Sequence, residues 1–246
     1  MSNLKAVILA AGKGTRMKSD LPKVLHCVGG VPMAKRVGDE AMKTGAESVC
    51  FVVGYGREKV EEALAGDGIS FVYQEEQLGT GHAVRCAEDY IGTEGDVMIL
   101  CGDTPLVRAQ TLGKAVEFHR SQGNGVTVLS AMVDDPSGYG RIVRDDDGAF
   151  VRSVEDKDAS ENEKKIKEIN SGIYVFEAKA LKESLGLLNN DNAQGEYYLP
   201  DTLEIIMKKG GKAGAYVIDD LSEIFGVNDR EHLAMAEDML AKREGK

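Results

Sequence analysis

The sequence lacks tryptophan, long apolar runs, and the cysteine and histidine spacings of a metal site. No stretch approaches the roughly 18 apolar residues of a membrane-spanning helix, and the first apolar run is too short and too soon followed by charge to be a signal peptide. The four cysteines show no C-x-x-C spacing and the four histidines no H-E-x-x-H spacing, which argues against zinc. We therefore expect reduced thiols, a cytoplasmic location and no binding to a membrane.

Basic charge is also scarce. Lysine and arginine number 30 against 41 aspartates and glutamates, so the formal net charge is -11. This balance argues against non-specific binding to nucleic acid or to an anionic membrane surface, because both need basic patches. With 246 residues and 42% hydrophobic content, the chain is long enough for one large α/β domain or two small ones.

Strand-like apolar runs alternate with helix-length segments in the first half of the chain. This alternation predicts an α/β fold of the Rossmann-like, three-layer kind, with a mostly parallel sheet and a ligand crevice at the carboxyl ends of its strands. The predicted strands cover residues 6–11, 47–53, 69–74 and 96–101. The predicted helices cover residues 32–43 and 57–65, and a third follows Gly81 and runs to about Tyr90.

The second half is predicted to be mixed rather than purely parallel. Residues 140–144 and 149–154 alternate in polarity around the turn at 145–148, as a β-hairpin does. The charged segment 155–168 is predicted to be a solvated loop or a short exposed helix. The remaining predicted strands cover 125–132, 169–176 and 212–218, and the remaining helices cover 109–122, 178–188, 200–209 and 229–242.

A glycine-rich, basic loop directly follows the first strand. Gly12 and Gly14 let the backbone turn and approach a ligand closely, and successive N–H groups in such a turn bind anions. The basic residues of this segment are Lys13, Arg16, Lys18 and Lys23. It is neither a dinucleotide-binding fingerprint, because Met17 replaces the third glycine, nor a P-loop, because Thr15 follows Gly14. We expect it to bind an anionic, phosphate-bearing ligand.

This loop resembles the signature of nucleotidyltransferases that join a nucleoside triphosphate to a sugar phosphate. Residues 9–17 read LAAGKGTRM, and Leu-Pro-Lys follows at 21–23. Further blocks of the resemblance lie in order at 74–83, 102–103, 138–141, 155, 170–172, 192–198 and 226–228. Together they are similar to the uridylyltransferases that form half of a bacterial bifunctional enzyme making UDP-N-acetylglucosamine. A solvated surface turn explains a lone G-x-G but not this ordered series.

The resemblance implies a role for each matched residue. Arg16, Lys23 and Asp103 are implied to be catalytic, and Asp103 with Asn228 to hold Mg²⁺. The implied substrate-binding residues are Leu9, Ala10, Ala11, Gly12 and Gly14 near the nucleotide, Gln74, Gly79 and Thr80 at the uracil edge, Cys101 and Gly102 beside them, Gly140, Glu155 and Asn170 at the amino sugar, and Asn228.

The implied reaction joins UTP to N-acetylglucosamine 1-phosphate and releases pyrophosphate, with Mg²⁺ as the cofactor. A phosphate oxygen of the sugar phosphate attacks the α-phosphorus in line, so the protein has to align two anions and neutralise their charge. One carboxylate and one amide, completed by phosphates and water, are a common ligand set for Mg²⁺. Because the attacking oxygen is already ionised near neutral pH, no general base is needed, and we take His82 and the cysteines as structural.

Other interpretations stay open at this point. Asp103 is equally suited to cap a helix, and four further residues have ordinary structural explanations when taken singly: Gln74, Glu155, Asn170 and Asn228. A nucleotidyltransferase for another base or sugar 1-phosphate is the nearest alternative function. A non-catalytic sugar-nucleotide sensor is a second alternative.

We expect residues 1–246 to form a single nucleotidyltransferase domain. About residues 1–110 are the nucleotide-binding half, about 111–228 the sugar-binding half, and about 229–244 a C-terminal helix. The acetyltransferase β-helix of the bifunctional enzyme has no counterpart in this sequence. Since the trimer of that enzyme depends on the β-helix, the sequence leaves the oligomeric state undetermined.

Overall fold

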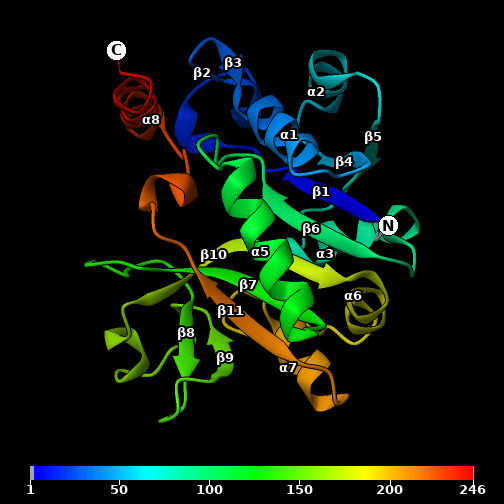
Figure 1. The fold of residues 1–246 in the computed structure, drawn as a ribbon. Helices are drawn as coiled ribbons and strands as arrows, with labels where there is room; N and C mark the ends of the chain where they lie inside the picture. Colours follow the sequence, from blue (N-terminus) through cyan, green and yellow to red (C-terminus); the bar gives the residue numbers. More distant parts are fainter. Residues whose placement is uncertain (1–2, 246) are drawn as a thin grey trace.

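A nine-stranded sheet forms the centre of the protein (Figure 1). The computed structural model describes residues 3–245. The main strand order is β11-β7-β10-β6-β1-β4-β5, and every strand on this path except β10 runs parallel to the others. These strands are β1 (Leu4–Ala10), β4 (Ser48–Val53), β5 (Ile69–Tyr73), β6 (Asp96–Cys101), β7 (Val126–Met132), β10 (Glu168–Glu177) and β11 (Ala213–Val217). The predicted, mostly parallel sheet is confirmed.

Helices cover both faces of the sheet and complete three layers. The helices on one face are α1 (Met33–Lys43), α2 (Arg57–Leu64) and α5 (Ala109–Gln122). Those on the other face are α3 (Thr80–Cys86), α4 (Glu88–Ile91), α6 (Ala178–Leu185) and α7 (Asp201–Lys208). Within β1, Ala6 and Ile8 pack toward the first set of helices and Val7 toward the second. Burial on both faces is the reason why β1 reads as an unbroken apolar run.

The antiparallel strand β10 carries the second half of the chain into the middle of the sheet. It pairs with β6 on one side and β7 on the other. Its register against β7 shifts between Asn170, opposite Ser130, and Tyr174, opposite Val128, so four residues of β10 span two of β7. Gly172, with a φ of 78°, lies inside this irregular stretch. The irregularity places the Asn-Ser-Gly segment next to the carboxyl end of β6.

The predicted hairpin is confirmed as β8 (Arg141–Arg144) and β9 (Phe150–Val154), which lie beside β10 at the lower end of Figure 1. Glu168 ties it to the sheet, because its carboxylate accepts from Arg144 Nε and Nη2 at 2.7 Å each and from Ser130 Oγ at 2.6 Å. We predicted Glu168 to lie in a solvated segment, and this is wrong. It is the first residue of β10 and is buried, because the bidentate arginine satisfies its charge.

A second difference concerns the helix predicted to run to about Tyr90. It breaks at Ala87, whose N–H bonds to the carbonyl of Val84 in a tighter turn, and α4 then starts in a new direction. After the break, the Tyr90 hydroxyl lies 2.8 Å from Ser48 Oγ, and Ile91 is fully buried. Packing against the sheet therefore overrides the local helical pattern.

The last helix, α8 (Arg230–Arg243), packs on a small ribbon of β2 (Cys27–Val28) and β3 (Val31–Pro32). Its buried Ala236 and Leu240 join a cluster with Leu106 and Val227. The shorter 3-10 turns are Thr15–Met17, Lys23–Leu25, Glu163–Lys165 and Leu221–Ile224. Within residues 3–245, no helix has the length and apolar character needed to cross a membrane.

Candidate active site

The carboxyl ends of β1 and β6 meet at the centre of the site. Leu9 lies opposite Cys101 in the parallel register, and the Gly102 N–H donates to the Leu9 carbonyl at 2.9 Å. A Cβ at residue 102 would lie 2.9 Å from that same oxygen, so only glycine fits there without a shift. The pairing places the glycine loop, which we define as residues 12–20, beside Asp103.

Three residues from distant parts of the chain converge at this point. Lys23 Nζ lies 2.5 Å from Asp103 Oδ2 and 3.3 Å from Asn228 Oδ1. The Val227 N–H donates to the Asp103 carbonyl at 2.8 Å, which holds the Asn228 segment against the end of β6. A carboxylate oxygen and an amide oxygen thus converge on a single positive charge. Both are hard oxygen donors of the type that divalent magnesium prefers.

Gly14 makes room for the Lys23 side chain. Its φ of 59° is left-handed, and a Cβ at this position would lie 2.5 Å from Lys23 Cβ. Any larger residue would therefore displace the lysine as well as strain the backbone.

The glycine loop is anchored from outside by Arg230, a residue that we did not predict. Arg230 Nε donates to the Met17 carbonyl at 3.1 Å and its Nη2 to the Lys18 carbonyl at 3.2 Å. Lys18 itself has a φ of 47°, an unusual conformation for a residue with a side chain. Met17 is buried. Arg16, the residue before it, is exposed. Arg230 thus helps to hold a short, otherwise exposed turn in one shape.

Two adjoining pockets open from the strand ends. The loop-side pocket, about 300 Å³, is lined by ten of the predicted residues: Leu9, Ala10, Ala11, Gly12, Lys23, Gln74, Gly79, Thr80, Cys101 and Asp103. The hairpin-side pocket, about 210 Å³, is lined by six: Leu9, Thr80, Cys101, Gly140, Glu155 and Asn170. Leu9, Thr80 and Cys101 belong to both, so the two pockets share a wall. Gly14, Arg16, Gly102 and Asn228 line neither pocket but lie in the loop and strand ends described above.

Gln74 is the most buried polar side chain of the loop-side pocket, with 3% of its surface exposed. Its Nε2 lies 3.3 Å from the Gly79 carbonyl and 3.1 Å from His82 Nδ1. Gly79 has a φ of 108°, and a Cβ there would lie 2.6 Å from the Tyr197 carbonyl. His82, which we took as structural, therefore contacts a predicted base-reading side chain.

The hairpin-side pocket is acidic and internally ordered. The Gly140 carbonyl accepts from the Asn170 N–H at 2.8 Å, and the Asn170 side chain bonds to both Ser153 and Tyr174. Burial, together with nearby Asp201 and other acids, raises the pKa of Glu155. Burial also raises the pKa of Asp201, to about 6. The acidic hairpin side and the basic glycine loop give the joined pockets opposite electrostatic ends.

Cys101 forms part of the shared wall. Its Sγ lies 3.4 Å from the Gly172 carbonyl, and burial beside Asp103 raises the pKa of its thiol to about 12. A thiol with a raised pKa is largely neutral near pH 7, which fits the structural role that we expected for Cys101.

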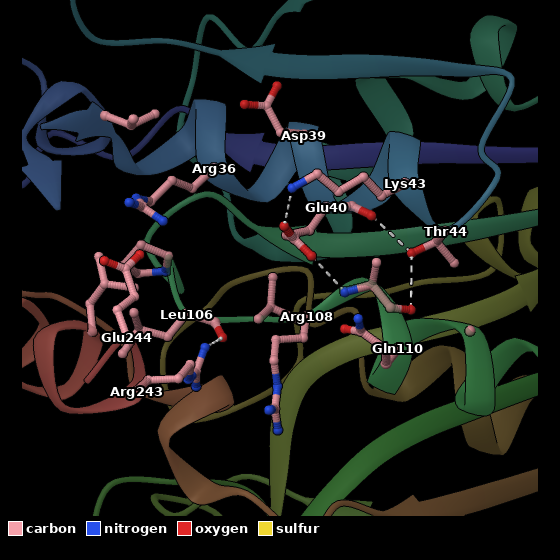
Figure 2. Close-up of a pocket in the computed structure, with 16 residues that line it drawn as sticks. Arg36, Asp39, Glu40, Lys43, Thr44, Leu106, Arg108, Gln110, Arg243 and Glu244 are labelled. Carbon is pink, nitrogen blue, oxygen red and sulfur yellow. Dashed lines mark hydrogen bonds and ion pairs between the residues drawn. The ribbon is translucent and has the colours of Figure 1, made fainter. Parts of the chain in front are cut away.

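A larger cavity, about 730 Å³, lies between α1, the segment after β6 and the end of α8 (Figure 2). None of the predicted site residues lines it. Its charged groups are engaged within the protein: Glu40 accepts from Lys43 at 2.7 Å and from the Ala109 N–H at 2.8 Å, and Arg243 donates to the Leu106 carbonyl at 2.8 Å. The joined pockets at the strand ends remain the candidate active site.

Several lining residues were not predicted. In the hairpin-side pocket they are Gly138, Tyr139, Ser171, Gly172, Tyr174, Leu199 and Pro200, and in the loop-side pocket Val24, Gln77, Ala83 and Glu196. Most of them lie inside the motif blocks that carry the resemblance, at 74–83, 138–141, 170–172 and 192–198, which is the signal that points to them. The blocks do not reveal which side chains face the cavity, because this depends on tertiary packing and, at Ser171 to Tyr174, on the irregular stretch of β10.

The family comparison matches this geometry. The nucleotidyl transferase family model matches residues 5–222, most of the chain. The chain belongs to this family. It is 55% identical over 243 residues to the bifunctional protein GlmU of Caldanaerobacter subterraneus and 48% identical over 241 residues to that of Clostridioides difficile. These alignments cover 99% and 98% of this chain but 53% and 52% of the relatives, so the chain spans about half their length.

Solved structures of the same architecture are similar to this one. A UDP-glucose pyrophosphorylase complexed with UDP-glucose superposes with a TM-score of 0.80 at 20% identity, over 99% of this chain and 100% of that one. A putative glucose-1-phosphate thymidylyltransferase from Bacillus anthracis gives a TM-score of 0.76 at 22% identity, over 96% of both chains. At these identities the likeness establishes the nucleotidyltransferase fold, as predicted.

Arg230→Ala is expected to loosen the glycine loop. Removing two hydrogen bonds of about 1 kcal/mol each should speed amide hydrogen exchange at Met17 and Lys18 by roughly tenfold or more. Arg243→Ala is the matched control, because it also removes an α8 arginine that donates to a backbone carbonyl, but one far from the loop. Unchanged exchange in the Arg230 variant, or equal acceleration in both, would contradict the anchoring role.

Asp201→Asn is expected to stabilise the protein increasingly as the pH rises. The folded pKa of about 6 lies above the unfolded 3.8, so the folded state binds more protons in between, and the wild type loses unfolding free energy as pH rises through this window. Urea unfolding at about pH 4.5, 6 and 7.5 should show the difference between variant and wild type growing and then levelling off. Asp146→Asn in the exposed hairpin turn is the control. A difference that stays constant with pH would refute the assignment.

Proposed function

We propose that the protein is a UTP-dependent N-acetylglucosamine-1-phosphate uridylyltransferase. The observation that carries the proposal is the convergence of Lys23, Asp103 and Asn228 at the strand ends beside the loop-side pocket. Family membership and the likeness to GlmU proteins support it. The proposal covers the uridylyltransferase activity alone and does not extend to the acetyltransferase activity that the resemblance implies for the second half of the bifunctional enzyme.

The loop-side pocket would take the nucleotide and the hairpin-side pocket the sugar. The sugar phosphate would then lie with its hydroxyls toward Glu155, which accepts hydrogen bonds, and its phosphate toward Lys23, which attracts it. The reverse orientation would place the phosphate against buried acidic charge, and repulsion disfavours it. The two ends of the site thereby orient a substrate that carries negative charge at one end and neutral hydroxyls at the other.

Catalysis then consists of alignment and charge neutralisation. A phosphate oxygen of the sugar phosphate forms a bond to the α-phosphorus of UTP, while the bond from that phosphorus to the bridging oxygen of the β-phosphate breaks and pyrophosphate leaves with the electron pair. Lys23 and Arg16 would offset the negative charge of the reacting and leaving phosphates. No proton has to be removed, because the attacking oxygen is already ionised near neutral pH.

Asp103 and Asn228 would hold Mg²⁺. Their oxygens already converge on the Lys23 ammonium, so this donor pair accommodates a cation, and both are hard ligands. When bound, the ion supplies further positive charge to the phosphate oxygens.

The wider organisation of the enzyme is part of the proposal. Residues 1–246 would act as one nucleotidyltransferase unit, with a nucleotide half of about 1–110 and a sugar half of about 111–228, and the shared pocket wall supports a single unit. The four free cysteines fit the reducing cytoplasm.

Pyrophosphate release measured with each of four nucleoside triphosphates and a panel of sugar 1-phosphates tests the proposed function. We expect the pair of UTP and N-acetylglucosamine 1-phosphate to give the largest kcat/KM, and chelation of divalent metal to abolish release. A larger value with another pair would assign the enzyme to that substrate, and no release with any pair would favour a sensor.

Replacing Arg16, Lys23 or Asp103 by Ala should lower kcat by about 100-fold or more, because each removes charge from the transition state or its metal. The free energy of unfolding should change by less than about 1 kcal/mol for Arg16, which is exposed. It should fall by about 1 to 3 kcal/mol for Lys23 or Asp103, because each is largely buried and loses its partner in the other's variant. Lys35→Ala and Asp39→Ala, which break an exposed ion pair of 3.0 Å on α1, are the matched controls. Near-normal kcat in all three site variants would refute the proposed chemistry.

A further inference from the structure

The Gln74 amide has both of its hydrogens committed to the protein. Its Nε2 lies 3.3 Å from the Gly79 carbonyl and 3.1 Å from His82 Nδ1. An amide nitrogen carries two hydrogens and no lone pair that accepts, so His82 Nδ1 must be the acceptor. This hydrogen bond requires the His82 tautomer in which Nδ1 carries no hydrogen and Nε2 does.

The Gly79 carbonyl disfavours the opposite orientation of the amide, and His82 Nδ1 supplies the second acceptor that holds the observed one. If the amide were turned over, its oxygen would face the Gly79 oxygen, and two acceptors at this distance repel. Within residues 3–245, no group donates to Gln74 Oε1. Gln74 lines the loop-side pocket, and Oε1 is the one polar atom of its side chain that has no partner among the described residues, so it is free to accept a hydrogen bond from a ligand there.

An acceptor at this position selects a particular kind of base. A pyrimidine with an N–H at ring position 3, as in uracil, can donate to Oε1. Cytosine has a lone pair there and would set acceptor against acceptor. Thymine presents the same N–H as uracil, so the informative comparison is UTP with CTP.

We propose that His82 is a specificity-positioning residue, which holds the Gln74 amide so that its oxygen faces the nucleobase and favours an N–H donor over an acceptor. The proposal rests on the proposed function, in that the loop-side pocket has to bind the base. His82 does not touch the base and acts through Gln74.

The backbone around His82 is well placed to hold the ring. His82 lies in the first turn of α3, where the preceding Gly81 N–H donates to the Tyr197 carbonyl at 2.7 Å. The His82 and Tyr197 rings pack with their centres 6.5 Å apart. Without the imidazole, one buried amide hydrogen of Gln74 loses its acceptor. Only the longer hydrogen bond to the Gly79 carbonyl then holds the amide, so the amide can rotate to bring the unpaired hydrogen toward the pocket, where it offers a donor to cytosine.

The test is the ratio of kcat/KM for UTP to that for CTP in His82→Leu, His82→Ala and His82→Asn. Leu and Ala remove the acceptor and should lower the ratio by roughly tenfold, the effect of one buried hydrogen bond. Asn can place its Oδ1 near the position of Nδ1 and should keep the ratio within about threefold of wild type. The KM for the sugar phosphate should not change in any of these variants. A general structural defect would change it.

A Gln74→Leu background provides the second arm. If His82 acts through Gln74, His82→Leu should cause no further change in the ratio when Gln74 is already Leu. Calorimetric binding of UTP and CTP gives the same comparison without turnover. Wild-type enzyme that turns over no UTP defeats the proposed function. Active wild type with an unaltered ratio in both the Leu and Ala variants, or an additive effect in the Gln74→Leu background, overturns the role of His82 alone.

Discussion

The parallel pairing of β1 with β6 is the constraint on which the site depends. It sets Leu9 opposite Cys101 and brings the Gly102 N–H to the Leu9 carbonyl. The two segments that leave these strands are the glycine loop and the turn at Asp103, so residues about 90 positions apart in sequence come to share one edge. A register shift of one residue would turn every side chain of one strand to the opposite face and disrupt its packing against the helices on both sides. Burial of the strands therefore also fixes the position of the charged groups beyond their ends.

The charges follow a simple division. The protein is acidic overall, with a formal net charge of -11, yet the glycine loop is basic and the hairpin side acidic. Lys23 lines the loop-side pocket, and its ammonium contacts both Asp103 and Asn228. A fold that draws opposite charges to adjoining ends of one cleft is suited to a pair of substrates that carry phosphate at one end and neutral hydroxyls at the other.

Most of the fold was predictable because its elements have strong local patterns. The strand at 96–101 and the helix at 109–122 have the predicted bounds, and the hairpin has its predicted turn. Two predictions were wrong where long-range contacts prevailed. Glu168 is buried because Arg144 and Ser130, both distant in sequence, satisfy it, and the helix after Gly81 breaks at Ala87 so that Ile91 can enter the core. The residues around Glu168 and Ala87 in the sequence do not reveal these long-range contacts.

The residue types of the site can be read from the chain: glycines where the backbone approaches a ligand, basic residues in the loop and a carboxylate at a strand end. These follow from local chemistry, since each depends on a residue and its immediate neighbours. Only the tertiary structure decided that Lys23 contacts both Asp103 and Asn228, that Arg230 anchors the glycine loop, and that His82 contacts Gln74. Each of these is a contact between separate segments, whose relative position is set by packing over the whole chain.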